Sequence, residues 1–334
     1  MKAKKWILVK DFCGTPSEEN LKLVDFDHRD KLEENEVLLQ AVYLSVDPYM
    51  RVWGKKEGQV MIGEQLSEVI HSRNGKFPIG ALVLSKAGWV THFISKGDDL
   101  SPIRFDLGKT PISYTLGVLG MTGATAYFGL NKCEPKDGEV FVISCAAGAV
   151  GSVAGQLAKL KGLKVIGLVG SDEKVRVCKQ EFGYDHVINY KKSNINEEIK
   201  KIAPDGVDIY FDNAGGTFYT SIIEHNMKNR GRVLVCGSIQ TYCCVDRSKL
   251  EKDVSDVIKS KNLSCIDFRA YNYYNEWPKA FNELNKLIQD GKLKVKEQVY
   301  HGFEKMRDAF YGLFEGENIG KSVVKVVNQS TNYP

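Results

Sequence analysis

One stretch, residues 139–174, constrains the fold of this chain most, because it contains the parts of a βαβ unit in order. A short β-branched apolar run ends in a glycine turn of the form A-x-G-x-x-G, and apolar residues at helical spacing and a second apolar run follow. The turn residues are Ala146, Gly148, Ala149, Val150 and Gly151. Gly148 would let the backbone approach a pyrophosphate, and Gly151 would let the helix lie close to the strand. The turn therefore predicts a dinucleotide whose phosphates bind the amides at the helix N-terminus.

The end of the second strand predicts which dinucleotide binds. Sites specific for NADH usually have an acidic residue there, about 20 residues after the first glycine, that binds the ribose 2′-hydroxyl. Here the strand ends at residues 169–171 without an acid. Asp172 and Glu173 read as the first turn of the next helix, N-capped by Ser171. Lys174 is close enough along the chain to meet a 2′-phosphate, although a solvated helix lysine is the alternative interpretation. The pattern favours NADPH/NADP+ as the cofactor.

The composition is that of a globular protein long enough for two domains. Of the 334 residues, 43% are hydrophobic and 26% are charged, and the net charge of +4 is spread without basic clusters. We therefore expect no nucleic-acid partner and, because no apolar run reaches about 18 residues, no membrane partner. The N-terminus is too charged for a signal peptide, and the eight cysteines show no C-x-x-C spacing. We expect reduced thiols and a cytoplasmic location.

Two segments of different character predict two domains. Residues 1–115 read as short strands separated by glycines, which predicts a partly open β-barrel. From residue 139 onwards strands alternate with helices, which predicts a doubly wound parallel sheet. The end of the chain reads as a helix and a strand that return to the β-rich part. The expected fold is α/β, with a discontinuous β-barrel domain of residues 1–115 and 300–334 and a parallel-sheet domain of residues 116–299.

Ligands bind doubly wound sheets at the carboxyl ends of the strands. We expect strands at 139–144, 164–169, 186–189, 207–212 and 232–236, and helices at 151–161, 173–182, 193–202, 217–228 and 249–259. Polar side chains near the ends of these strands are Tyr190, Asn213, Cys236 and Ser238. Each end alone could be a plain turn, but together they converge on one crevice. Met121 and Thr122 begin a helix that enters this domain, and we expect them at the cleft between the domains.

A loop in the β-rich part, residues 44–51 (LSVDPYMR), is a second candidate for a site. Asp47-Pro48 is a turn signal, because proline fixes its own φ and restricts the residue before it. The loop presents Tyr49 and Arg51 as an aromatic ring and a cation that could contact a substrate. A structural loop with its tyrosine packed inward is an equal alternative.

The sequence excludes two common catalytic sites and suggests a third. None of the six histidines is paired with cysteine or glutamate at zinc-ligand spacing, so we expect no metal. No G-x-S-x-G motif is present. Without a metal, hydride transfer needs a ready acceptor such as an α,β-unsaturated carbonyl, whose enolate oxygen then needs a hydrogen-bond donor. Tyr242, just beyond a strand end, suits that catalytic task, and a surface tyrosine is the alternative.

These motifs together resemble the medium-chain dehydrogenase/reductase family, and within it the prostaglandin reductases. The likeness covers almost the whole chain and includes LSVDPYMR, GMTGATAYFGL, AAGAVGSVAGQLAKLKG, VGSDEK, INYK, YFDNAGG, CGSIQTY and ENIGKSVVK. The resemblance implies that the barrel is a GroES-like catalytic domain and the parallel sheet a Rossmann domain for NADPH. It implies that the cofactor is held by Lys174 and Tyr190 at the 2′-phosphate and by Asn213, Cys236 and Asn318 elsewhere.

The resemblance also implies positions for the substrate. Tyr242 would lie over the nicotinamide ribose and the substrate oxygen, and Tyr49 and Arg51 would lie in the substrate-side loop. After Tyr242 the family has a proline-rich loop, whereas this chain has CCVDRSKLEKD. That difference leaves the preference for eicosanoids open.

The activity implied by the resemblance is NADPH-dependent reduction of the carbon–carbon double bond of enones and enals, including 15-oxo-prostaglandins and alkenals. Oxidation of leukotriene B4 at its 12-hydroxyl is a further expectation. The partners would be a small-molecule enone, enal or eicosanoid and a second copy of the chain in a homodimer. The alternatives are a quinone oxidoreductase of the same superfamily and a non-catalytic NADPH-binding protein. Tyr242 and the substrate loop argue against the non-catalytic alternative.

Overall fold

The computed structural model describes residues 2–29, 31–53, 56–103, 105–244 and 252–327, and the chain divides into two units. Unit 1 comprises Met1–Leu116, Glu297–Glu317 and Lys321–Pro334, and unit 2 comprises Gly117–Lys296 and Asn318–Gly320. The expected boundaries of a catalytic and a cofactor domain stay a prediction, since the units are defined by packing and not by function.

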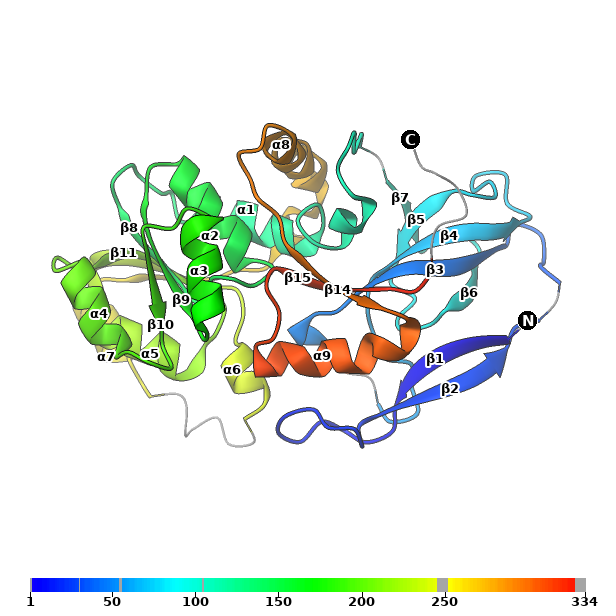
Figure 1. Ribbon diagram of the computed structural model, residues 1–334, viewed down its shortest axis with the longest axis horizontal. Coiled ribbons are helices and arrows are strands. Elements are labelled where there is room, and N and C mark those ends of the chain that lie inside the picture. The colour runs from blue at the N-terminus through cyan, green and yellow to red at the C-terminus, as the bar shows by residue number, and fades with distance from the viewer. Residues whose placement is uncertain (1, 30, 54–55, 104, 245–251, 328–334) are drawn as a thin grey trace. The chain divides into compact units, whose positions relative to one another are not determined.

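Unit 2 is built on a six-stranded parallel sheet with the strand order β10-β9-β8-β11-β12-β13 (Figure 1). Its strands are β8 (Val140–Ile143), β9 (Lys164–Val169), β10 (His186–Asn189), β11 (Val207–Asp212), β12 (Met227–Val235) and β13 (Ser264–Asp267). The central strands are apolar over most of their length and buried, as expected for a parallel sheet covered on both faces. The chain proceeds outward from β8 through β9 to β10 and then crosses to β11 on the other side. The reversal between β8 and β11 is where such sheets bind ligands.

Helices connect and flank these strands. They are α1 (Met121–Lys132), α2 (Gly151–Leu160), α3 (Asp172–Gln180), α4 (Ile195–Ile202), α5 (Gly216–His225), α6 (Ile239–Tyr242), α7 (Ser255–Ser260), the 3-10 segment η4 (Ala270–Glu276) and α8 (Trp277–Gln289). The predicted cap of α3 is confirmed, because the Ser171 hydroxyl accepts a hydrogen bond from the Lys174 amide at 3.3 Å. This cap fixes where α3 begins after β9, and so fixes the backbone position of Lys174 in its first turn.

Unit 1 contains a seven-stranded mixed sheet and a separate hairpin. In the sheet, β14-β15-β3-β4-β5-β7 are neighbours in that order and β6 pairs with β3, while β1 pairs with β2. The strands are β1 (Lys2–Leu8), β2 (Leu21–Asp27), β3 (Val37–Ser45), β4 (Gln65–Ser72), β5 (Leu82–Ser85), β6 (His92–Ser95), β7 (Leu100–Pro102), β14 (Glu297–His301) and β15 (Lys321–Lys325). The helical segments are η1 (Pro48–Arg51), η2 (Ile112–Leu116), η5 (Phe303–Lys305) and α9 (Met306–Glu315). The predicted fold class is confirmed.

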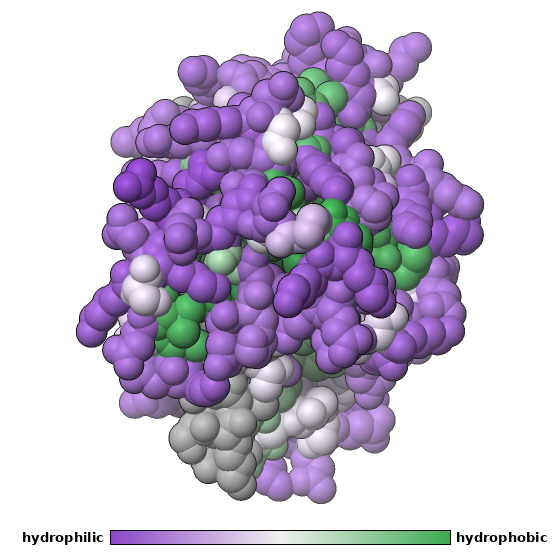
Figure 2. Space-filling model, turned by 90° about the vertical axis from the view of Figure 1, so that its left-hand side faces the viewer, coloured by the Kyte–Doolittle hydropathy of each residue, from purple (hydrophilic) through white to green (hydrophobic). Residues whose placement is uncertain are grey.

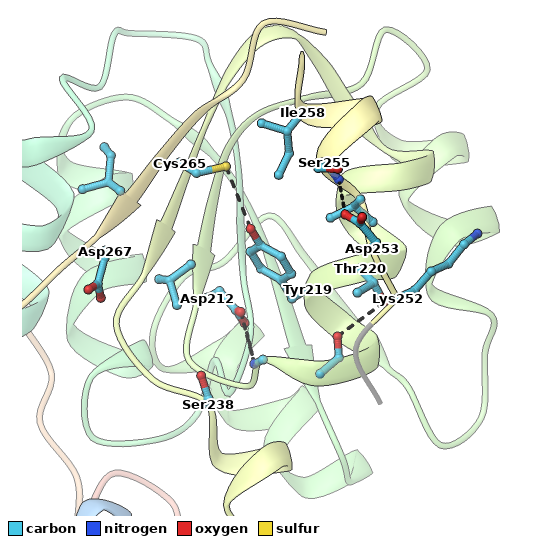
Figure 3. A pocket seen from close by; sticks show the side chains of 15 residues that line it. Asp212, Tyr219, Thr220, Ser238, Lys252, Asp253, Ser255, Ile258, Cys265 and Asp267 are labelled. Atoms are coloured by element: carbon cyan, nitrogen blue, oxygen red, sulfur yellow. Dashed lines mark hydrogen bonds between the residues drawn. The ribbon is translucent and has the colours of Figure 1, made fainter. Parts of the chain in front are cut away.

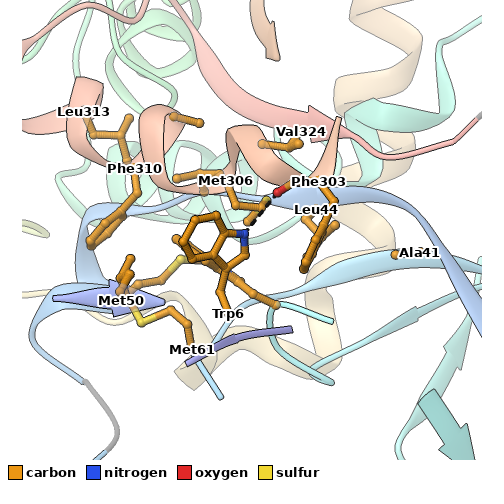
Figure 4. Packing of buried hydrophobic residues seen from close by; sticks show 14 of the residues in the cluster. Trp6, Ala41, Leu44, Met50, Met61, Phe303, Met306, Phe310, Leu313 and Val324 are labelled. Carbon is orange, nitrogen blue, oxygen red and sulfur yellow. Dashed lines mark hydrogen bonds between the residues drawn. The ribbon is translucent and has the colours of Figure 1, made fainter. Parts of the chain in front are cut away.

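The core of unit 1 joins the two ends of the chain around Trp6. Its indole Nε1 donates a hydrogen bond to the Phe303 carbonyl at 3.1 Å, so the first strand is tied to the segment before α9 (Figure 4). Phe310 of α9 packs edge-on against Trp89 with ring centroids 5.7 Å apart, and Met50 of η1 is buried in the same cluster. The loop that contains η1 is therefore anchored to the core of unit 1 by the buried Met50 side chain.

The structure differs from several expected elements for identifiable reasons. The helix expected at 217–228 ends at His225, and β12 starts at Met227 rather than at residue 232. Its polar first half contains a register shift against β11, and Arg230 has a φ of 61°, so no strand pattern is visible there. In the helix expected at 249–259, residues 249–251 lie outside the described residues, as does the expected disorder from residue 328 onwards.

None of the described helices is long and apolar enough to cross a membrane. The face drawn in Figure 2 is mostly hydrophilic, and its apolar side chains form only small patches.

Candidate functional site

The glycine turn between β8 and α2 is held in one tight conformation. Cys145 starts it with a left-handed φ of 51°, and the Cys145 carbonyl accepts a hydrogen bond from the Gly148 amide at 2.9 Å. A Cβ on Gly151 would lie 2.3 Å from that carbonyl oxygen, so only glycine fits there. Helix α2 has no side-chain N-cap, and the first amides of a helix have no acceptor within it. The half-buried residues Ala149 and Val150 thus present amides to an anion.

A tyrosine that the sequence did not single out braces this turn from the interior. The buried Tyr184 hydroxyl donates a hydrogen bond to the Gly151 carbonyl at 2.7 Å. A Cβ on Gly155 would lie 2.2 Å from the same hydroxyl oxygen, and one on Gly167 of β9 would lie 2.9 Å from the Tyr184 ring. The glycines of α2 and β9 therefore leave space for the Tyr184 side chain, whose hydrogen bond holds the backbone of the turn in place.

The ends of β8 and β11 are joined by a buried polar network at the reversal of the sheet. The Ser144 hydroxyl donates to the Asp212 carboxylate at 2.9 Å and accepts from the Asn213 amide at 2.8 Å. The Asn213 side-chain Nδ2 donates to the Ser144 carbonyl at 2.9 Å. Burial raises the pKa of Asp212, and a hydrogen bond from the Tyr210 hydroxyl at 2.7 Å opposes that effect. Asn213 is thus fixed at the carboxyl end of β11.

Cys236 completes the orientation of Asn213 from the end of β12. Its thiol donates a hydrogen bond to the Asn213 Oδ1 at 2.9 Å, so both ends of that amide are held. Burial raises the pKa of Cys236 well above its usual value, which keeps it a neutral donor rather than a nucleophile. Beyond it, the Gln240 amide donates to the Ala214 carbonyl at 2.9 Å. This bond ties α6, which ends at Tyr242, to the turn after β11.

The ends of β9 and β10 form a cationic corner. A Cβ on Gly170 would lie 2.5 Å from the Tyr190 hydroxyl and 3.5 Å from the side chain of Lys191. Burial lowers the pKa of Lys174, and the charge of Lys191 lowers it further. The Tyr190 hydroxyl and the Lys191 side chain thus both lie beside Gly170, and the charge of Lys191 acts on Lys174. Lys191 was missed in the sequence, although it directly follows Tyr190.

Three further residues predicted to contact the cofactor, Asn318, Met121 and Thr122, also lie in unit 2. The Gly320 amide donates to the Ala147 carbonyl at 2.7 Å, and the Asn318 Nδ2 donates to the Gly320 carbonyl at 2.9 Å, so Asn318 is held beside the glycine turn. Met121 and Thr122 begin α1. The Thr122 hydroxyl oxygen is buried and has no hydrogen-bond partner among the described residues.

A pocket of about 680 Å³ opens beside the ends of β11, β12 and β13 (Figure 3). The last residue of each strand lines it, namely Asp212, Val235 and Asp267, together with Ser238 and Tyr219. Ser238 was predicted as a cofactor contact, whereas the pocket itself had no signal in the sequence. Its opening lies on the same sheet edge as Asn213.

Tyr49 and Arg51 belong to unit 1, on η1. The Tyr49 ring lies 5.0 Å from that of Trp53. The Arg51 guanidinium donates to the carbonyls of Gly14 at 2.7 Å and Phe12 at 3.2 Å. Arg51 therefore holds the loop at residues 12–14, whatever further contact it makes.

Comparison with known proteins assigns this fold to a family. A model described as the N-terminal domain of oxidoreductase matches residues 4–103, and one described as zinc-binding dehydrogenase matches residues 149–286. The chain is 46% identical to prostaglandin reductase 1 of Bos taurus over 97% of its own length and 99% of the relative's. The chain belongs to the medium-chain dehydrogenase/reductase family. The resemblance drawn from the motifs is thereby confirmed.

Two further known proteins are similar to this chain over nearly its whole length. An NADP(+)-dependent 2-alkenal reductase of Nicotiana tabacum is 36% identical, with 97% of this chain and 98% of the relative covered. The crystal structure of CurA in complex with NADPH from Vibrio vulnificus is 33% identical, with a TM-score of 0.89 over 97% of this chain and 99% of that chain. The whole length of the fold is thus shared, not one motif.

The residues of unit 2 fit the dinucleotide of a medium-chain dehydrogenase/reductase. The uncapped start of α2 suits a pyrophosphate, and the cationic corner of Lys174 and Lys191 suits a 2′-phosphate. The buried Thr122 hydroxyl has no hydrogen-bond partner among the described residues. A polar group of a ligand bound at α1 would supply that partner. The set therefore matches NADPH better than NADH.

The model that matches residues 149–286 is described as a zinc-binding dehydrogenase. Among residues 2–29, 31–53, 56–103, 105–244 and 252–327, no three His, Cys, Asp or Glu side chains are grouped as metal ligands. The expectation that this chain works without a metal stays a prediction, which a chelation experiment tests.

Proposed function

We propose that this chain uses NADPH to reduce the carbon–carbon double bond of α,β-unsaturated ketones and aldehydes. The observation that carries the proposal is the 46% identity to bovine prostaglandin reductase 1 over nearly the full length of both chains. The tobacco 2-alkenal reductase supports the enal part of the substrate range. The proposed substrates are 15-oxo-prostaglandins and alkenals.

The cofactor would be held along the carboxyl edge of the parallel sheet. The amides of Ala149, Val150 and Gly151 bind the pyrophosphate, since their helix has no side-chain cap. Lys174 and the neighbouring Tyr190 bind the 2′-phosphate, with Lys191 as an additional cation. An anion at this corner would relieve the repulsion between the two ammonium groups.

The nicotinamide end would lie at the reversal between β8 and β11. The residues proposed to contact it or the adjoining phosphates are Met121, Thr122, Ala146, Gly148, Asn213, Cys236, Ser238 and Asn318. The fixed Asn213 amide and the buried Thr122 hydroxyl are suited to a carboxamide, which needs both donors and acceptors. Such fixed partners would select one face of the ring.

When bound, NADPH supplies the hydride that adds to the β-carbon of the enone. Negative charge then moves to the carbonyl oxygen, and the α-carbon takes a proton. We assign the Tyr242 hydroxyl, at the end of α6, as the donor that stabilises this oxygen and as the first group in the path of the proton. Tyr49 and Arg51 of η1 would contact the remainder of the substrate.

The test is NADPH oxidation by the purified chain against 15-oxo-prostaglandin, 4-hydroxynonenal and a quinone. We expect turnover with both the enone and the enal, and product analysis should find the saturated carbonyl. Faster turnover of the quinone, with the enones untouched, would favour the quinone oxidoreductase alternative. A separate assay with leukotriene B4 and NADP+ tests the oxidation of the 12-hydroxyl.

We further propose a cytosolic homodimer. The sheet of unit 2 ends at β13, whose outer edge pairs with no other described strand and is open to a second copy. None of the eight cysteines, all of which lie in the described residues, is joined in a disulfide, which is compatible with a reducing compartment. Light scattering of the eluting protein tests the dimer, and fractionation of cells that express the chain tests the location.

A further inference from the structure

A lysine and an aspartate are buried together in unit 1, where β15 begins beside the end of β3. Lys321 is 3% exposed and Asp47 is 5% exposed, and the Lys321 ammonium lies 3.1 Å from Asp47 Oδ1. The same ammonium donates to the Val46 carbonyl at 2.7 Å and to the Ser322 carbonyl at 2.9 Å. The ammonium thus has two carbonyl acceptors and one carboxylate as its ion-pair partner.

This ion pair is an unusual choice for stability alone. Removing two charges from water is unfavourable, and a buried pair can often be replaced by apolar side chains without loss of stability. The Asp47 carboxylate is fully used, since its second oxygen accepts from the Ser45 hydroxyl. Arrangements of this kind impose one geometry on the backbone that carries them.

The backbone so fixed is the start of η1. The Asp47 carbonyl accepts the first hydrogen bond of η1, from the Met50 amide at 3.2 Å. The Asp47 side chain does not cap η1, because it is directed to Lys321 and Ser45 instead. Lys321 thus sets the direction in which the chain leaves β3, while the buried Met50 sets its depth.

We propose that the Lys321–Asp47 pair is a positioning device for residues 47–53, which sets the place of Tyr49 toward the substrate. The inference depends on the proposed function, in which Tyr49 contacts the enone. Lys321 and Asp47 are positioning residues here and touch neither substrate nor cofactor. Their removal should affect the use of the enone far more than the binding of NADPH.

The same segment contains an optical probe that does not depend on activity. All four tryptophans lie in the described residues; Trp53 is 61% exposed, whereas Trp6, Trp89 and Trp277 are buried. Iodide, which reaches only exposed indoles, should therefore quench Trp53 almost alone. Trp53 lies 5.0 Å from the Tyr49 ring, so a displaced segment changes this quenching.

The experiment compares Lys321→Met and Asp47→Leu, singly and together, with the wild type. Each single variant leaves one buried charge without its partner, so its thermal midpoint should fall. In the double variant the midpoint should recover in part, since Asp47 and Lys321 no longer leave each other unpaired, while Glu297 loses the stabilising charge of Lys321 on the paired strand. Its kcat/KM for the enone should stay at least about tenfold low, because a misplacement on the order of 1 Å can lower rates a hundredfold. Iodide quenching of Trp53 should stay altered, and the Kd for NADPH should not change.

The matched control is the ion pair of Arg232 and Glu139 in unit 2. The double variant Arg232→Met, Glu139→Leu should leave both Trp53 quenching and the enone KM at wild-type values. If the Lys321–Asp47 double variant does not fold, Asp47→Asn keeps the size and one acceptor and should shift quenching and KM in the same direction.

Recovery of stability together with wild-type quenching and wild-type kcat/KM in the double variant would overturn the inference and leave the pair a structural contact. Wild-type quenching and KM in Asp47→Asn would overturn it as well. A wild-type protein inactive on every enone would instead refute the proposed function, and the quenching of Trp53 would still decide whether the pair positions residues 47–53.

Discussion

Replacing either of two glycines of the turn by alanine should weaken NADPH binding, but only one of the two replacements should also destabilise the fold. A Cβ on Gly148 would meet the protein only at Cys145, 3.2 Å from its carbonyl oxygen and 4.0 Å from its Cβ. A Cβ on Gly151 would lie 2.3 Å from the same oxygen. Gly148→Ala can therefore keep the turn closed and occupy the space of the pyrophosphate, whereas Gly151→Ala must open the turn itself.

The expected loss of affinity in Gly148→Ala follows from the bonds it displaces. A hydrogen bond to a charged group contributes about 1.5–3 kcal/mol, so losing two at the weaker end removes about 3 kcal/mol. At about 1.4 kcal/mol per factor of ten, the Kd for NADPH should rise roughly a hundredfold. The free energy of unfolding should change by no more than about 1 kcal/mol, because alanine also lowers the entropy of the unfolded chain.

The assay is a fluorescence titration with NADPH beside urea unfolding of each variant. Gly151→Ala should lose stability and affinity together. Gly75→Ala is the control, since no heavy atom lies within 4 Å of its Cβ position and its φ is not left-handed. A Gly148→Ala variant with the wild-type Kd would refute the placement of the pyrophosphate at this turn.

Three further predictions concern the rest of the site. Lys174→Ala should raise the KM for NADPH and leave the KM for NADH nearly unchanged. The ammonium of Lys192 pairs with Asp172, so the control Lys192→Ala should change neither KM. Equal losses with both cofactors would contradict a phosphate contact at Lys174. Dialysis against a strong chelator should leave full activity, and stoichiometric zinc whose removal abolishes turnover would contradict metal independence. Tyr242→Phe should lower kcat with an enone roughly a hundredfold at unchanged NADPH affinity, because the hydroxyl acts only as charge develops; wild-type turnover with chemistry rate-limiting would leave Tyr242 a wall of the pocket.

The parallel sheet was predictable because its signals are local. Strands β10 and β11 have the predicted bounds, since each is a short apolar run between turn residues. In unit 1 the strand β4 has no clear signal in the sequence, because it carries Gln65, Ser67 and Glu68 at buried positions and so lacks the apolar alternation of a half-buried strand. Burial of polar side chains in partnered networks is set by the fold and leaves no mark on the pattern.

Some residues of the candidate site were predictable from the sequence, and others come together only in the folded chain. The glycines and the lysine after β9 follow from spacing along the chain, and their contacts with the cofactor stay a prediction. The brace of the turn does not follow, because Tyr184 contacts Gly155 and Gly167 through space and no spacing rule connects them. The same holds for Ser144 and Asp212, which meet only because β8 and β11 become neighbours in the sheet.

Arg51 shows how a residue in a recognised motif can serve the scaffold first. Its Nε and Nη2 donate to the Gly14 carbonyl, and its guanidinium lies 5.6 Å from the Phe12 ring centroid. A planar fork that is already hydrogen-bonded on one edge has fewer donors left for a substrate oxygen. We therefore expect the substrate-side role predicted for this motif to fall mainly on Tyr49. The backbone of Tyr49 lies between the Lys321–Asp47 pair and the buried Met50. A site of this kind combines a rigid support with one adaptable aromatic contact, which suits substrates that share an enone and differ in their chains.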